Sequence, residues 1–185
     1  MSEVAAFVAW LGAAVIVLAD SRRGLAAGLA VVALAAAAIA WSQGEEGGAI
    51  VLLAGGVLGS ALRFTIGPDG WGLMQPGSTP RLLLTVVVAL VALWVALAVT
   101  TGASAGFRFA VLTVLVLLGG RLLEAAEPAA MLTAIAGVAL VLGIVSGDGI
   151  VSYAVAALVT AGVSAMPMPA TPRPHGLHRP RPRVP

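Results

Sequence analysis

The chain has 185 residues, of which 60% are hydrophobic and only 10% are charged, with a formal net charge of +2. A soluble domain would carry roughly a quarter charged residues to cover its surface, so a mean hydropathy of +1.06 excludes that class. Apolar runs longer than the segments of about ten residues in a membrane barrel leave an all-α polytopic membrane protein. Cysteine is absent, which excludes disulfides, thiolate metal sites and cysteine nucleophiles.

Charges and turn-forming residues divide the chain up to residue 166 into apolar runs, and each run predicts a transmembrane helix. The predicted spans are 4–19, 24–42, 47–64, 82–100, 107–123, 129–146 and 149–166. Each is near the length that crosses about 30 Å of hydrocarbon at about 1.5 Å per residue. The first run follows an acidic "MSE" and precedes two arginines, so we expect a retained helix and not a cleaved signal peptide. Residues 1–166 are therefore predicted to form a helical membrane domain.

The arginines predict the orientation of these spans. Seven crossings place five span-flanking arginines on the same side as the C-terminal tail: Arg22, Arg23, Arg63, Arg81 and Arg121. Arg108 alone faces the other side. Because positive charge near span ends marks the cytoplasmic side, we expect the N-terminus outside and the C-terminus in the cytoplasm. The predicted location is the cytoplasmic (inner) membrane of a prokaryote, where the chain is a multi-pass plasma-membrane protein.

The third run and the connection after it offer candidate contact sites. Gly55 and Gly59 are four residues apart in "LAGGVLGSAL", a spacing that favours close helix–helix packing. The longest connection, residues 63–81, is rich in Gly and Pro and contains Trp71. With Arg63 and Arg81 at its ends, it is a candidate docking loop for a partner or for lipid. The alternative is an ordinary loop whose Trp71 lies at the headgroup level.

The stretch "GRLLEAAEPAA" concentrates charge at the junction of the fifth and sixth runs. Arg121 and Glu124 are three residues apart, so they can pair on one helix face. Glu127 precedes Pro128, a residue favoured in the first turn of a helix, where a carboxylate meets the positive end of the helix dipole. This reading makes the stretch an ion pair and a helix start at the membrane surface. The alternative is a proton-accepting carboxylate site.

The tail, residues 167–185, is predicted to be disordered and cytoplasmic because its many prolines exclude a helix. Its arginines are candidates for contact with anionic lipid headgroups or with an acidic partner subunit: Arg173, Arg179, Arg181 and Arg183. A basic tail on an apolar body does not make a nucleic-acid-binding face, so no nucleic-acid partner is expected. Two histidines in such a segment make a poor metal site, and no metal is expected.

No acidic or basic side chain falls in the middle of any predicted span, and no motif for nucleotides, cofactors or nucleophilic catalysis is present. We therefore expect no enzymatic activity and no cofactor. The favoured function is a non-catalytic, accessory integral membrane subunit that packs against other integral membrane subunits of a larger complex. Respiratory or hydrogenase-type membrane arms contain small polytopic subunits of this build, a comparison that rests on topology alone. The alternative is an autonomous small transporter or channel with Glu124 and Glu127 as coupling carboxylates.

Overall fold

The computed structural model describes residues 2–66, 79–99, 102, 104–124, 127–147 and 149–167. All regular structure in these ranges is helical, which confirms the predicted all-α class. The helices are α1 (Ser2–Leu18), α2 (Arg22–Ser42), α3 (Glu46–Thr65), α4 (Thr79–Val99), α5 (Ala105–Glu124), α6 (Pro128–Ser146) and α7 (Ile150–Ser164). Each helix occupies one of the apolar runs recognised in the sequence.

Four helices, α2, α3, α5 and α6, are long and apolar enough to cross a membrane by length and composition. Shorter apolar stretches occur in the other three, at Glu3–Leu18, Val86–Ala96 and Ile150–Ser164. Large aliphatic side chains are exposed on the outer faces of several helices, Ile50, Val87 and Leu158 among them. A helix that is apolar on its outer as well as its inner face is suited to lipid surroundings.

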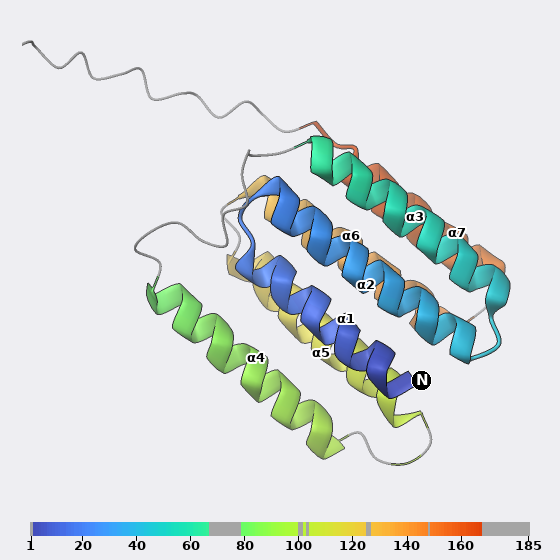
Figure 1. Cartoon of the computed structure of the whole chain (residues 1–185), viewed down its shortest axis with the longest axis horizontal. Coiled ribbons are helices and arrows are strands. Elements are labelled where there is room, and N and C mark those ends of the chain that lie inside the picture. The colour runs from blue at the N-terminus through green and yellow to red at the C-terminus, as the bar shows by residue number, and fades with distance from the viewer. Residues whose placement is uncertain are drawn as a thin grey trace, which may run out of the picture.

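The helices form two layers and an edge (Figure 1). Consecutive helices run antiparallel, with α1, α2 and α3 side by side in one layer and α5, α6 and α7 in the other. Each helix of the first layer packs on one of the second: α1 on α5, α2 on α6, and α3 on α7. Helix α4 lies at the edge, where it contacts α5 and, less extensively, α1. Because of this order, α1, α3, α5 and α7 all finish at the same end of the bundle.

Small residues bring the layers together. More than half of the buried hydrophobic residues in the described part of the chain are alanines, which let helix backbones approach closely. Gly55 and Gly59 lie against α7: a Cβ added at Gly59 would be 2.9 Å from Cγ2 of Thr160, and one added at Gly55 would overlap Ala157. On the opposite side of α3, a Cβ at Gly56 would overlap the methyl group of Ala33 in α2. Helix α3 therefore makes close glycine contacts with two neighbours, where the sequence pattern indicated one.

Candidate functional site

The arginines gather at one end of the bundle. Arg22 and Arg23 begin α2, Arg63 lies in the last turn of α3, and Arg121 lies in the last turn of α5. We call this the arginine end; it is where α1, α3, α5 and α7 finish and where α2 and α6 begin. In the described part of the chain, only Arg108 lies elsewhere, in the first turns of α5. Within the described residues, the arginine end is where positive charge is most concentrated.

Two of these arginines are almost completely buried: Arg63 is 0% exposed and Arg121 is 2% exposed. They are the largest buried side chains among the described residues. Removing a guanidinium from water costs several kcal/mol unless hydrogen bonds and an opposite charge compensate for it. The two arginines are compensated to very different degrees.

Arg121 has an acidic partner. Its Nη2 donates a hydrogen bond to Oδ1 of Asp20 at 2.5 Å and another to the carbonyl of Ala19 at 3.2 Å. Asp20 lies in the short turn between α1 and α2, so this ion pair fastens that turn to the end of α5. The carbonyl of Ala19 follows the end of α1, where the negative end of the helix dipole favours a cation. Arg121 thus links α5 to the end of α1, and this structural role accounts for its burial.

This arrangement corrects the expected pairing of Arg121 with Glu124. Glu124 is exposed at the end of α5, whereas the guanidinium of Arg121 faces the turn of a neighbouring helix. A charge-assisted bond to Asp20 in a partly desolvated position is stronger than a pair between exposed side chains on one helix. The guanidinium therefore makes its ion pair within the bundle and leaves Glu124 at the surface.

Glu127 stands at the N-cap position of α6, followed by Pro128 in the first turn. Its backbone is extended, with φ −96° and ψ 117°, and its half-buried side chain makes no capping hydrogen bond. The helix begins where the sequence predicted. Residues 125 and 126, which separate the two glutamates on the chain, lie outside the described residues. Within the described part of the chain, neither Glu124 nor Glu127 forms an ion pair.

Arg63 has a weaker set of partners. Its Nη2 donates to the carbonyl of Val163 in the last turn of α7 at 3.2 Å, while Nε and Nη1 are buried without an acceptor. The hydroxyl of Ser164, the next residue along, is also buried and makes no hydrogen bond. A Cβ added at Gly59, one turn before Arg63, would lie 3.2 Å from this hydroxyl. The end of the α3–α7 contact thus collects unused hydrogen-bond donors, and no described acidic side chain pairs with Arg63.

The neighbouring α2–α3 contact is also positively charged at this end. The guanidinium carbon of Arg23 lies 5.9 Å from the ring centroid of Phe64, a cation–π contact between the start of α2 and the end of α3. Phe64 directly follows Arg63 in the chain. Two guanidinium groups therefore flank the same turn of α3.

Interior hydroxyl groups bond to the backbone. Each of the following donates to the carbonyl four residues earlier in its own helix: Ser60 to Gly56 at 2.7 Å, Thr113 to Phe109 at 2.7 Å, Thr133 to Ala129 at 2.7 Å, and Thr160 to Ala156 at 2.8 Å. Thr160 also lies 3.2 Å from the carbonyl of Ala136 in α6. Such bonds satisfy a hydroxyl inside an apolar helix and leave it little capacity to bind a solute.

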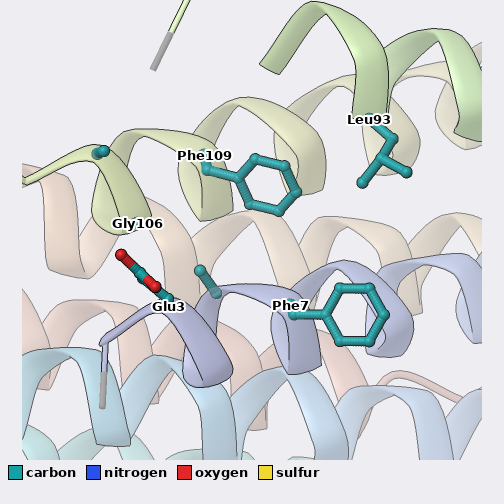
Figure 2. Close-up of a pocket in the computed structure, with 7 residues that line it drawn as sticks. Glu3, Phe7, Leu93, Gly106 and Phe109 are labelled. Carbon is teal, nitrogen blue, oxygen red and sulfur yellow. The ribbon is translucent and has the colours of Figure 1, made fainter. Parts of the chain in front are cut away.

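A cavity of about 420 Å³ opens between α1, α4 and α5, at the end of the bundle opposite the arginine end. It is lined by Glu3, Ala6, Phe7, Leu93, Ala105, Gly106 and Phe109. Figure 2 shows the rings of Phe7 and Phe109 and the side chain of Leu93 around this space, with Glu3 near Gly106. Glu3 is the one charged side chain among the described lining residues, and it is exposed in the first turn of α1. The described part of the lining lacks the converging polar groups that orient a specific small molecule.

The remaining predicted contact residues lie beyond what the structure describes. Arg81 belongs to α4, but its side chain is not among the described ones. Trp71 and the four tail arginines, Arg173, Arg179, Arg181 and Arg183, fall outside the described residues.

Two polar residues of the arginine end, Asp20 and Ser164, were not singled out in the sequence. In the sequence, one residue separates Asp20 from the two arginines that follow it, a pattern typical of a solvated turn. Ser164 ends an apolar run, a position typical of a helix terminus. No local pattern relates either residue to an arginine about a hundred positions away.

Comparison of the chain with protein-family models, with curated proteins and with solved structures found no match.

Proposed function

We propose that this protein is a non-catalytic integral subunit of a larger membrane protein complex. In this proposal all seven helices cross the prokaryotic cytoplasmic membrane, with the N-terminus outside and the arginine end in the cytoplasm. A respiratory or hydrogenase-type membrane arm is the kind of assembly in which such a subunit would serve. This comparison rests only on the similar topology of their small polytopic subunits.

Two features support the membrane placement. The helices keep apolar side chains on their outer faces, and the charged side chains are confined to the two ends of the described helices. The asymmetry of the arginines, with Arg108 alone on the far side, supports the cytoplasmic assignment of the arginine end.

The observation that carries the non-catalytic role is the way interior polar groups are used. The buried hydroxyls of the bundle centre donate to backbone carbonyls, and the buried guanidinium of Arg121 is held by Asp20. Carriers and pumps place free ionisable groups or broken helices near mid-depth, where they bind solute or protons. A bundle whose central hydroxyl groups are already bonded to its own backbone is better suited to packing against neighbours, and the unused donors of Arg63 and Ser164 lie at the end of the bundle, away from its centre.

Helix α4 is the surface on which a neighbour would have most to contact. It buries small residues, Ala89, Ala92 and Ala96, against the bundle. Its other described side chains form an apolar face, on which Trp94 is 71% exposed and Leu90 is 55% exposed. Large exposed aromatic and aliphatic groups are typical of the centres of helix–helix interfaces and of lipid-facing surfaces alike.

Co-purification tests the proposal directly. The tagged full-length chain, extracted in a mild detergent from its native membrane, should elute with other integral membrane proteins in stoichiometric amounts. Extraction in a harsh detergent, which separates subunits, is the control for specific association. A monodisperse complex that contains this chain alone in the mild detergent would refute the proposal.

The alternative, an autonomous transporter, draws support from the exposed Glu124 and the half-buried Glu127, neither of which has an ion-pair partner in the described structure. Solute-driven proton flux into vesicles reconstituted with the pure chain, and its loss in Glu124→Gln and Glu127→Gln, would favour this function. Glu46→Gln, at the opposite end of the bundle, is the matched control because it removes the same charge. We expect no flux above that of empty vesicles for the wild-type chain or for any variant.

A further inference from the structure

The guanidinium of Arg63 is a buried positive charge without a counter-charge in the described structure. It is 0% exposed, and its one hydrogen bond to a described residue goes to the carbonyl of Val163, a neutral acceptor. A carbonyl at the end of a helix attracts a cation, but it does not balance a whole charge removed from water. Arg121, the other buried arginine, differs in this respect because Asp20 supplies its counter-charge.

The donors around Arg63 have a definite arrangement. Val163 holds Nη2, which fixes the guanidinium against α7 and leaves Nε and Nη1 for another acceptor. The buried hydroxyl of Ser164 adds a further donor at the same contact of α3 with α7. Gly59 has no side chain, which lets the end of α7, with Ser164, approach the turn of α3 that precedes Arg63. The set is suited to an oxyanion that accepts several hydrogen bonds at once.

The position of this site in the bundle indicates which kind of oxyanion could bind there. Arg63 and Ser164 lie at the ends of α3 and α7, and Arg23 adds positive charge beside them through its contact with Phe64. If the bundle spans the membrane, helix ends of this kind lie at the depth of the lipid headgroups. A phosphate offers more acceptor oxygens than a carboxylate, and anionic headgroups are attracted to clustered arginines on the cytoplasmic face.

We propose that Arg63, with Ser164, binds the headgroup phosphate of an anionic membrane lipid between the ends of α3 and α7. The inference rests on the membrane placement of the proposed function, and it adds a specific lipid site to it. The bound phosphate supplies the missing counter-charge and joins the ends of the two helices.

Lipid binding to the purified full-length chain tests this site. The chain, stripped of lipid in detergent, is titrated with phosphatidylglycerol, with phosphatidylcholine and with inorganic phosphate, and bound lipid is counted by native mass spectrometry. Thermal unfolding in the same samples reports stabilisation, since a ligand that binds only the folded state raises the midpoint. We expect phosphatidylglycerol to bind one to one at low concentration and to raise the midpoint more than the other two additives do.

Arg63→Gln should bind phosphatidylglycerol about tenfold or more weakly, because hydrogen bonds from a charged donor are lost. Ser164→Ala, a milder change that preserves the fold, should weaken binding by about two- to tenfold, as expected for one neutral hydrogen bond. Arg22→Gln removes the same charge from the same end of the bundle and is the matched control; its affinity should stay within about twofold of the wild type.

Three results would overturn the inference. Equal binding by the wild type, Arg63→Gln and Ser164→Ala would show that the lipid binds elsewhere or only to the overall charge. Equal stabilisation by inorganic phosphate would make the ligand a free anion, and a partner carboxylate crosslinked to the site in the intact complex would make it a protein. If the lipid fails to bind at this site while the chain still co-purifies with other membrane proteins, only this inference fails. If the lipid binds as expected but extraction in a mild detergent yields the chain alone, only the proposed function fails.

Discussion

Replacing Gly55 by alanine tests the close approach of α3 and α7, the contact on which the candidate site depends. In the structure a Cβ at position 55 would overlap both the Cβ and the Cα of Ala157, and it would lie 3.1 Å from the carbonyl oxygen of that residue. Two of these three atoms are backbone atoms, so the contact cannot be relieved by a change of rotamer. The two helices must move apart, or one must shift along the other.

The cost follows from two opposing terms. Forcing an extra methyl group into a packed contact destabilises by about 1–3 kcal/mol, while replacing glycine by alanine within a helix stabilises by roughly 0.5–1 kcal/mol. We therefore expect Gly55→Ala to lower the free energy of unfolding by about 1–2 kcal/mol. Gly119→Ala is the matched control, because an added Cβ there meets nothing within 4 Å. That variant should be stabilised by roughly 0.5–1 kcal/mol.

The assay is unfolding of the purified chain in mixed micelles with increasing dodecyl sulfate, followed by far-UV circular dichroism. The two variants should differ by about 2 kcal/mol, roughly a thirtyfold difference in the unfolding equilibrium constant. If Gly55→Ala proved as stable as Gly119→Ala, the helices would not approach as closely as described. The shared site of Arg63 and Ser164 would then lose its geometric basis.

Further predictions concern the ion pair and the orientation. Asp20→Asn should destabilise by about 2–3 kcal/mol in the same titration, because Arg121 stays buried without its counter-charge. Adding Arg121→Met to this variant should restore most of the lost stability. If the destabilisation in the double variant equalled the sum of the two single effects, the residues would not form a direct pair. The chain has no cysteine, so single cysteines can map the topology in intact cells with a membrane-impermeant maleimide. Gln43→Cys should react from outside and Leu123→Cys only after lysis; reaction of both from one side would refute the proposed orientation.

The positions of the helices and of the charged ends could be read from the sequence. Apolar runs interrupted by arginine, glutamate and glycine mark where a chain of this composition leaves an apolar environment, and each described helix lies on such a run. Proline at position 128 similarly marked the start of α6. These features depend on local composition and on backbone preferences, which act over one or two helical turns.

The contacts between helices were decided by tertiary structure. In a soluble helix an apolar stripe reveals the packed face, but helices rich in alanine, leucine and valine on every side carry no such stripe. The sequence therefore did not indicate that Gly56 packs on α2 or that α4 is the edge helix. Asp20 and Arg121 meet because the turn after α1 lies beside the end of α5. Glu124 is closer to Arg121 in sequence, but it is not the residue with which Arg121 pairs. Arg63 is likewise buried because α7 packs over the end of α3, a contact between segments about a hundred residues apart that no local pattern encodes.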